Sequence, residues 1–212
     1  MLIIFDLDGT LLNTLDDLDA AANHALTACG FAPRTVDECR QFVGNGVTKL
    51  LERALPETAR GSENLTRIRA AFLAYYDAHL WDNTYPYNGM GDVLAALQTR
   101  GVKLAVASNK YRAATERLIA HFFPQITFAA VLGQRENVPV KPHPQIVQDI
   151  LAAAHETPAH TVYVGDSDVD MQTAQNAGVK ACAVTWGFRP RDVLAQYSPA
   201  YMIDKPYQLL DI

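Results

Sequence analysis

Cysteines are few in this 212-residue sequence, and it contains neither a long apolar run nor a block of positive charge. The three cysteines, Cys29, Cys39 and Cys182, form no CxxC pair, which excludes a disulfide framework and a zinc knuckle and favours a reducing cytoplasm. With 18 Lys and Arg against 23 Asp and Glu, the net charge of −5 argues against nucleic acid as a partner. No stretch approaches the roughly 20 apolar residues of a membrane span, and residues 1–5 are too short for a signal peptide. We therefore expect a soluble, cytoplasmic protein without a membrane partner.

The composition is that of an ordinary globular protein. Apolar residues make up 49% and charged residues 19%, with 12 Gly and 11 Pro, which excludes disordered, collagen-like and coiled-coil classes. The length favours one domain, or a core that carries a small insertion.

Short apolar runs rich in β-branched residues alternate with segments of helical spacing over most of the chain. This alternation predicts an α/β fold with a doubly wound parallel sheet and covering helices. The predicted strands are residues 2–5, 102–107, 128–132, 161–164, 181–185 and 201–203.

One interval departs from this alternation. Residues 15–81 contain no strand-like run, and their apolar positions recur at helical spacing. Thr35 and Glu38 match a capping box, which places a helix start inside the interval. The sequence therefore predicts a helical insertion over residues 15–82 in a core formed by residues 1–14 and 83–212.

Two acidic residues, Asp6 and Asp8, follow the first predicted strand. Ligands of open parallel sheets bind at the carboxyl ends of the strands. Residues two apart in an extended chain face the same side, so both carboxylates can address one small ligand, and Gly9 permits a sharp exit. The alternative interpretation of this segment alone is a solvated Asp-Gly turn.

Polar residues suited to phosphate follow the other predicted strands as well. The segment Gly165–Asp170 holds three further acids, and Lys141 precedes a proline in a loop before a predicted helix. One site can thus collect these groups, which are Asp6, Asp8, Thr10, Ser108, Asn109, Lys141, Asp166 and Asp170.

Clustered carboxylates repel one another unless a counter-charge is present. No His or Cys lies at ligand spacing, so an all-oxygen Mg²⁺ site is the natural solution. The predicted substrate is a phosphate ester, whose phosphoryl oxygens Thr10, Ser108 and Asn109 would hold. Lys141 and Mg²⁺ would neutralise the charge that develops as the ester bond breaks.

The four segments Asp6–Thr10, Ser108-Asn109, Lys141-Pro142 and Gly165–Asp170 together resemble the four motifs of haloacid dehalogenase superfamily phosphatases. Within that superfamily they are most similar to the phosphoglycolate phosphatase group. Each motif is weak alone, but their order along nearly the whole chain is specific.

The resemblance implies a role for each acid. Asp6 matches the nucleophile that becomes an aspartyl-phosphate, and Asp8 matches the general acid and base. It also implies that Asp6, Asp8 and Asp166 hold the metal while Asp170 supports the metal site. Asp168 falls where the family tolerates variation. Asp8 further favours phosphate esters, because the dehalogenases and phosphonatases of the superfamily lack this second acid.

The helical insertion matches the position of the family's cap, which closes over the site and excludes water. Substrate specificity is expected in its segment around Gly44, Asn45, Gly46 and Lys49, whose glycines before a helix offer amides to a small carboxylate. The simpler interpretation is that Gly44 and Gly46 only separate two cap helices.

The sequence thus predicts a Mg²⁺-dependent phosphomonoesterase acting on a small acidic metabolite, with 2-phosphoglycolate as the leading substrate, in a monomer or homodimer. Three alternatives stay open: a sugar phosphomutase with the same motifs, a non-catalytic phosphoaspartate switch, and an inactive metabolite-binding descendant. A mutase would isomerise with little phosphate release. A receiver-type switch would be shorter and lack the insertion, and the intact acid pair argues against the inactive descendant.

Overall fold

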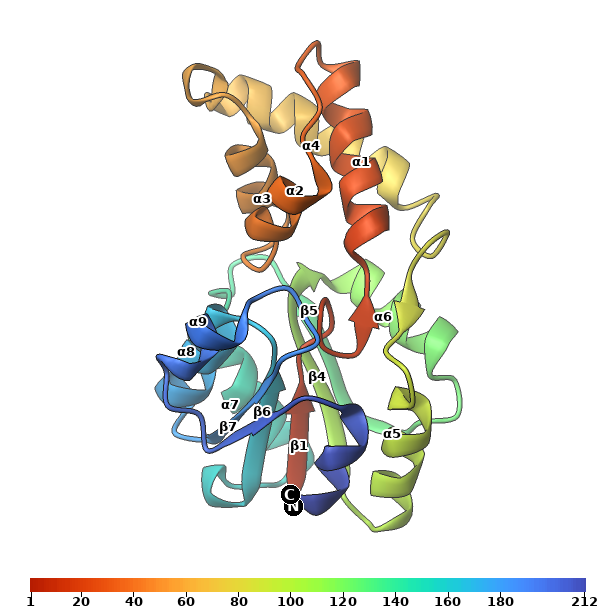
Figure 1. Cartoon of the computed structure of the whole chain (residues 1–212), viewed down its shortest axis with the longest axis vertical. Helices are drawn as coiled ribbons and strands as arrows, with labels where there is room; N and C mark the ends of the chain where they lie inside the picture. Colours follow the sequence, from red (N-terminus) through yellow and green to blue (C-terminus); the bar gives the residue numbers. More distant parts are fainter. The chain divides into compact units, whose positions relative to one another are not determined.

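The chain folds into two units, and Figure 1 shows the sheet of the one and the helices of the other. The computed structural model describes residues 1–212. The core unit comprises Met1–Asn13 and Pro86–Ile212, and the helical unit comprises Thr14–Tyr85. The chain therefore returns to the core unit at residue 86, a few residues later than the boundary at residue 83 that the sequence suggests.

The core unit contains a six-stranded sheet, made of β1 (Leu2–Phe5), β4 (Lys103–Tyr111), β5 (Phe128–Gln134), β6 (Thr161–Gly165), β7 (Lys180–Val184) and β8 (Tyr201–Ile203). The order is β5-β4-β1-β6-β7-β8, and all neighbouring strands are parallel. The chain first builds outward from β1 through β4 to β5 and then continues on the other side with β6. The strand order reverses beside β1, so a ligand site is expected at the carboxyl ends of β1, β4 and β6.

Helices cover both faces of this sheet, which is why β1 is buried along its whole length. The helices are α5 (Met90–Thr99), α6 (Arg112–Phe122), α7 (Gln145–Ala154), α8 (Asp168–Ala177) and α9 (Arg191–Ala195), with 3₁₀ helices η2 (Pro158–His160) and η3 (Pro206–Asp211). Side chains of α7 and α8 pack against the face that carries Leu2 and Ile4. Ile3 and Phe5 point to the opposite face and are equally buried. The predicted doubly wound α/β fold is confirmed.

The helical unit consists of α1 (Leu15–Ala28), α2 (Val36–Phe42), α3 (Val47–Ala54), α4 (Ser62–Tyr76) and the 3₁₀ helix η1 (Glu57–Ala59). The predicted capping box is confirmed: the Glu38 amide donates to Thr35 Oγ1 and the Thr35 amide donates to Glu38 Oε2, at 3.3 and 2.8 Å. The expectation of helices without strands over residues 15–81 is also confirmed. Across the whole structure, no helix combines the length and apolar character needed to cross a membrane.

The strands differ from expectation in two places. The short strands β2 (Leu12–Asn13) and β3 (Tyr85–Pro86), which pair where the chain leaves and re-enters the core unit, were not predicted. The strand expected at 102–107 is longer, because Tyr111 of β4 still pairs with Gln134 of β5 after a register shift. The polar residues 108–110 therefore lie on a strand rather than in a loop after one.

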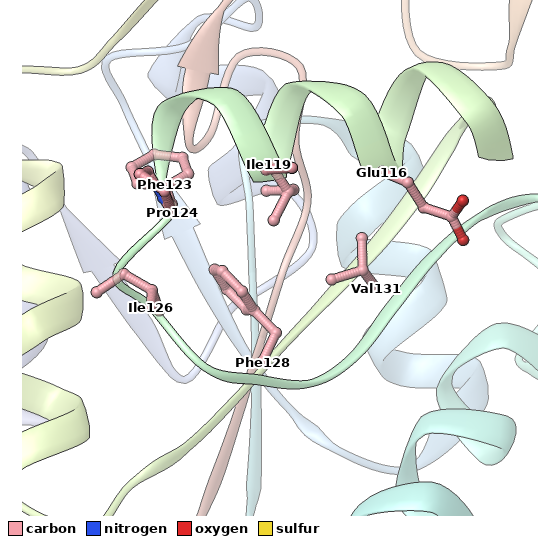
Figure 2. A pocket seen from close by; sticks show the side chains of 8 residues that line it. Glu116, Ile119, Phe123, Pro124, Ile126, Phe128 and Val131 are labelled. Atoms are coloured by element: carbon pink, nitrogen blue, oxygen red, sulfur yellow. The ribbon is translucent and has the colours of Figure 1, made fainter.

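An apolar hollow lies against α6 and the edge strand β5 (Figure 2). One of its eight lining residues is charged, and that residue, Glu116, is acidic. The others are Ile119, Ala120, Phe123, Pro124, Ile126, Phe128 and Val131. Without a cation, this hollow is no site for a phosphate ester.

Candidate active site

Buried charged residues concentrate at the carboxyl ends of the central strands. Burying a charge is unfavourable unless it is paired, so such a concentration needs a reason. Six charged residues are buried in the whole chain, and the only one outside this place is Asp17 of the helical unit. The other five are Asp6, Lys110, Lys141, Asp166 and Asp170.

Each of these residues is placed by the element that precedes or carries it. Asp6 follows β1, and its amide extends the strand pairing by donating to the carbonyl of Val164 at 2.9 Å. Asp166 follows β6, and Asp170 lies in the first turn of α8. Lys141 reaches in from the loop before α7. The topology therefore gathers residues that are up to 164 positions apart in the sequence.

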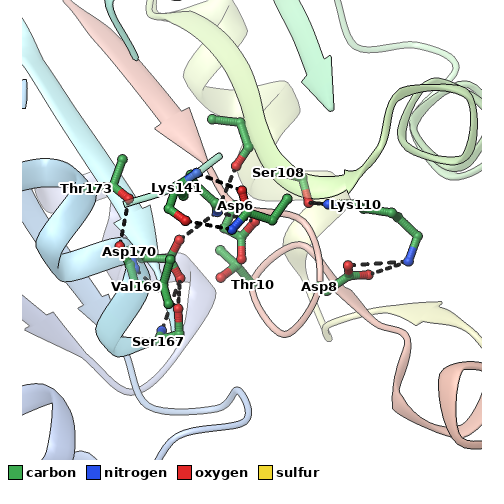
Figure 3. A network of polar contacts seen from close by, with 12 residues as sticks. Asp6, Asp8, Thr10, Ser108, Lys110, Lys141, Ser167, Val169, Asp170 and Thr173 are labelled. Carbon is green, nitrogen blue, oxygen red and sulfur yellow. Dashed lines mark hydrogen bonds and ion pairs between the residues drawn. The ribbon is translucent and has the colours of Figure 1, made fainter. Parts of the chain in front are cut away.

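Lys141 is the cation at the centre of this cluster (Figure 3). Its Nζ lies 2.8 Å from both Asp6 Oδ1 and Asp170 Oδ1, and it also donates to the Ala107 carbonyl and the Tyr163 hydroxyl, each at 3.0 Å. Burial lowers the pKa of Lys141, but the charges of Asp170 and Asp6 outweigh burial and hold the pKa well above its usual value. Lys141 is thus a fixed positive charge.

Asp166 is held from two sides. Its Oδ1 accepts from the Thr10 hydroxyl at 3.0 Å, and its Oδ2 accepts from the Phe188 amide at 2.7 Å. Gly9 has a φ of +86°, and a Cβ at this position would collide with the Asp166 carboxylate. The Asp-Gly pair of the first motif therefore serves a close approach to the site, which an ordinary surface turn does not require.

Asp170 is saturated with hydrogen bonds. Its Oδ1 accepts from Lys141 and from the Tyr163 hydroxyl, the latter at 3.3 Å. Its Oδ2 accepts from the amide and hydroxyl of Ser167, which caps α8 and forms a capping box with Asp170. With both oxygens occupied in this way, Asp170 is suited to orienting Lys141 and supporting a metal site rather than to binding an ion directly.

Burial and neighbouring carboxylates raise the pKa of two of these acids, Asp6 and Asp166. Burial raises the pKa of Asp6 well above its usual value, and the charges of Asp170 and Asp166 add to this while Lys141 opposes it. Burial and the charge of Asp170 raise the pKa of Asp166 to about 7. The three carboxylates therefore need more positive charge than Lys141 supplies.

A divalent cation fits this deficit. One oxygen from each of Asp6, Asp166 and Asp170 lies within 4.8 Å of the others. The donors are hard oxygens with no sulfur or imidazole among them, which is the set that Mg²⁺ prefers. Because Asp170 is committed to other partners, Asp6 and Asp166 are the side chains best placed to hold the ion.

Asp8 lies apart from this carboxylate group. Its side chain is paired with Lys110, whose Nζ lies 2.9 Å from Oδ1 and 3.3 Å from Oδ2 (Figure 3). The Lys110 side chain is 2% exposed and that of Asp8 is 13% exposed. The carboxylate of Asp8 is not in the group of three that could hold an ion, so its role as a metal ligand stays a prediction.

The side chains predicted to hold phosphate make contacts within the protein. Asn109 donates to the carbonyl of Lys141 at 3.1 Å and accepts from its amide at 2.8 Å. Ser108 Oγ accepts from the Lys110 amide at 3.2 Å. Thr10 bonds Asp166 as described above. All three are buried at the site, but Asn109 fixes the backbone of Lys141, so its contact with phosphate stays a prediction.

The predicted specificity residues belong to the helical unit. Gly44 and Gly46 have φ values of +126° and +82°, and the second of them precedes the first residue of α3. Asn45 accepts from Arg53 at 2.8 Å, and Lys49 pairs with Glu52 on an exposed part of α3. The positive φ values of Gly44 and Gly46 favour glycine, which the simpler interpretation of a break between two helices also expects. Their role in specificity stays a prediction.

Sequence reasoning missed Lys110, Tyr163 and Ser167. The available signals were a lysine directly after the apolar part of a predicted strand, a tyrosine inside a buried strand, and a serine three residues before an acid at a helix start. Each is common in proteins without an active site. Only the assembled sheet shows that they contact Asp8, Lys141 and Asp170, respectively.

Comparison with known proteins gives a consistent result. The sequence pattern of the haloacid dehalogenase-like hydrolase family matches residues 3–184. Phosphoglycolate phosphatase 1 of Pseudomonas aeruginosa is 33% identical over 99% of this chain and 78% of its own length. A phosphoglycolate phosphatase of Cereibacter sphaeroides is 34% identical over 88% of this chain and 86% of its own length.

Solved structures agree with the sequence comparison. A crystal structure of a protein from Lactobacillus delbrueckii subsp. bulgaricus superposes with a TM-score of 0.92, at 31% identity, over 98% of this chain and 95% of that one. A predicted phosphoglycolate phosphatase of Haemophilus somnus 129pt also gives a TM-score of 0.92, at 28% identity, over 99% and 96% of the two chains.

Proposed function

This chain belongs to the haloacid dehalogenase-like hydrolase family and is a phosphatase; from this premise we propose that it hydrolyses 2-phosphoglycolate through a phosphorylated Asp6. The observation that carries the proposal is the buried Asp6 carboxylate, held by Lys141 beside Asp166 at the carboxyl end of β1. The substrate is supported by the names of the relatives that span most of the chain.

The first step is in-line attack on phosphorus. Lys141 holds Asp6 through Oδ1, so Oδ2 is the oxygen that attacks. The bond between phosphorus and the ester oxygen breaks, and Asp8 donates its proton to the departing alkoxide. Protonation of the leaving group is typically worth roughly 10² to 10⁴ in rate. The products of this step are the alcohol and an acyl phosphate on Asp6.

The second step removes the phosphoryl group from Asp6. Asp8, now ionised, accepts a proton from water, whose oxygen attacks phosphorus. The bond between phosphorus and Asp6 breaks, which restores the carboxylate and releases inorganic phosphate. One residue thus acts first as an acid and then as a base, which requires that its carboxyl reach both the leaving group and the water.

We propose Mg²⁺ as the cofactor, held by Asp6 and Asp166 together with Asp8 as the resemblance implies. When bound, it would neutralise negative charge on the cluster and on the phosphoryl oxygens. Lys141 supplies the second, permanent positive charge. Asp170 fixes Lys141 by its ion pair and holds no part of the substrate.

We further propose that the helical unit acts as a cap and that its Gly44–Gly46 loop contributes to substrate choice. The glycine conformations leave the first amides of α3 without side-chain cover, which suits an anion. We place the activity in the cytoplasm, because free cysteines without a disulfide suit a reducing compartment. A monomer or homodimer stays our expectation for the assembly.

A phosphate-release screen tests the function. It compares 2-phosphoglycolate, hexose phosphates and nucleotides with and without Mg²⁺. We expect Mg²⁺-dependent release that is fastest with 2-phosphoglycolate. Isomerisation of a hexose phosphate with little release of phosphate would instead establish a mutase.

Acid quenching during turnover tests the intermediate. With substrate labelled in the phosphoryl group, we expect the label on the peptide that contains Asp6, and its loss when fresh unlabelled substrate is added before the quench. Direct transfer to water without labelled protein would contradict the proposed mechanism.

A further inference from the structure

Lys110 is a buried cation for which the mechanism above gives no role. The residue is 4% exposed, and its ammonium is paired with Asp8, which is not fully buried. Burying an ammonium is unfavourable, and a hydrophobic residue of similar size is often tolerated equally well in place of a buried ion pair. A lysine buried beside the proposed acid and base therefore needs a reason.

The backbone fixes Lys110 firmly. It lies near the end of β4, its amide donates to Ser108 Oγ at 3.2 Å, and its carbonyl accepts from Thr115 Oγ1 of α6 at 3.3 Å. A Cβ at Gly133 of the neighbouring β5 would collide with the Lys110 carbonyl, so the two strands approach closely there. The side chain is therefore presented from a rigid position.

The two lysines of the site serve different places. Lys141 shares its ammonium among four acceptors on the Asp170 side of Asp6. An ammonium has three protons, so Lys141 has no hydrogen bond to spare for the leaving group. Lys110 lies with Asp8 on the other side of Asp6 in Figure 3.

The position of Asp8 locates Lys110 relative to the substrate. If Asp8 protonates the ester oxygen, the two must come within about 3 Å of each other. The ammonium of Lys110, 2.9 Å from Asp8 Oδ1, is then within about 6 Å of that oxygen. In an ester of glycolate, the carboxylate carbon is two bonds from the same oxygen. The carboxylate of the leaving alcohol is therefore close enough to the Lys110 ammonium to pair with it.

From this geometry, and resting on the proposed phosphatase function, we infer that Lys110 is a specificity residue that binds an anionic group on the leaving alcohol close to the ester oxygen. The favoured substrates are phosphate esters of small hydroxy acids. Part of the selection for a carboxylate thereby resides in the core unit, in addition to any contribution of the cap loop. Neutral alcohols form no ion pair with the cation and gain nothing from it.

The test compares two esters that differ in this charge. Wild type, Lys110→Met and Lys110→Arg are assayed with 2-phosphoglycolate and with ethyl phosphate. We expect Lys110→Met to lower kcat/KM for 2-phosphoglycolate by roughly 10²-fold, as for loss of a charge-assisted hydrogen bond. For ethyl phosphate we expect a loss about 10-fold smaller, because both esters lose the support that Lys110 gives Asp8 and only 2-phosphoglycolate also loses the ion pair. The ratio of the two kcat/KM values therefore reports the recognition of the carboxylate, and Lys110→Arg recovers part of the preference.

A matched control comes from the same strand. Lys103 begins β4 at the opposite end of the sheet, where it pairs with Glu156 and is 44% exposed. Lys103→Met makes the same chemical change, and we expect it to alter the ratio of the two kcat/KM values by less than about twofold, as for a surface ion pair. Thermal unfolding of all variants shows whether Lys110→Met is folded.

A binding measurement separates recognition from chemistry and covers the case of an inactive variant. In an Asp6→Asn background, calorimetry with 2-phosphoglycolate should give a Kd about 10-fold or more weaker when Lys110→Met is added. Equal losses for the two esters, or an unchanged Kd, would overturn the inference and make Lys110 a residue that only positions Asp8. If wild type releases phosphate from neither ester nor from any other phosphomonoester, the proposed function itself fails.

Discussion

Each unit of the molecule buries a carboxylate completely or nearly so, and the two are satisfied in different ways. Asp17 of α1 accepts from the amides and side chains of Asn83 and Thr84 at 2.7 to 3.0 Å, and all of these donors are neutral. Asp170 of the core unit accepts from Lys141, Tyr163 and Ser167. Asp17 belongs to no cluster of three such acids, whereas Asp170 has two carboxylates within 4.8 Å.

The difference separates a structural acid from a functional cluster. Asp17 joins the start of α1 to the segment before β3, and its charge is compensated locally by dipoles. In the core unit, four carboxylates including Asp8 face two lysines, so acidic groups outnumber the cations that can pair with them. A cluster of like charges is stabilised by a counter-ion, so a fold that leaves such a cluster without enough opposite charge favours a ligand site there.

The largest expected effect comes from Asp6→Asn. Phosphate release should fall by about 10⁴-fold or more, because an amide cannot attack phosphorus. The metal-free protein should be no less stable, because the change removes one of several buried like charges. Steady-state kinetics and thermal unfolding measure both. Asp168→Asn is the control, since Asp168 is 35% exposed beside Arg189 and outside the cluster. Turnover that survives in Asp6→Asn refutes the assignment of the nucleophile.

The next effect concerns the metal. Asp166→Asn should raise the Mg²⁺ concentration that gives half-maximal activity by roughly 10- to 100-fold, the range seen when partners of a metal site are removed. The oxygen of the new amide can still accept from the Phe188 amide while its NH₂ group donates to the Thr10 hydroxyl oxygen, so the fold should be retained. Titration of activity with Mg²⁺ measures the effect, and an unchanged half-point removes Asp166 from the ligand set.

A smaller effect, on stability rather than on activity, is expected in the helical unit. Asp17→Asn puts an NH₂ group against donors that previously faced an acceptor, so it should lower the free energy of unfolding by about 1 to 3 kcal/mol. Asp16→Asn, the exposed neighbour, is the control and should change it by less than about 0.5 kcal/mol. Chemical denaturation measures both. Equal stability of the two variants would show that the buried acid is not structural.

The last effect is a dependence of stability on pH. The pKa of Asp166 is raised to about 7 in the folded protein, so the folded state keeps a proton that the unfolded state loses. The free energy of unfolding of the metal-free protein should therefore fall as pH rises from 5 to 7, with Asp166 contributing up to about 1.4 kcal/mol per pH unit and Asp6, whose pKa is also raised, adding to the slope. Mg²⁺ should reduce this slope, and Asp166→Asn should do the same. A rise in stability over that range would contradict the charge deficit.

Much of the fold could be predicted because the spacing of apolar residues along the chain reflects which side chains are buried in each strand and helix. Apolar runs of strand length gave the positions of β1 and β8 to the residue, and helical spacing gave the insertion. The strand end at residue 107 was wrong, since hydrophobicity stops there while pairing with β5 continues to Tyr111. Backbone hydrogen bonds do not depend on side-chain polarity, so a polar strand end is invisible to such a pattern.

The candidate site divides in the same way. The acids Asp6 and Asp166 with Lys141 could be found because each follows a strand or precedes a helix in a place where parallel sheets collect ligands. Two contacts could not be predicted: Lys110 pairs with Asp8, and Asn109 holds the backbone of Lys141. Both contacts join segments more than 30 residues apart.

The sequence by itself determined the class of this protein: which residue types exist, the order in which apolar and polar segments alternate, and hence a parallel sheet with acids at its carboxyl edge. Tertiary structure alone decided how the charges at that edge are shared, with Lys141 held among Asp6 and Asp170 and Lys110 held by Asp8. The physical reason is that periodicity and turn chemistry act between near neighbours in the chain, whereas electrostatic pairing depends on distances in space that only packing sets.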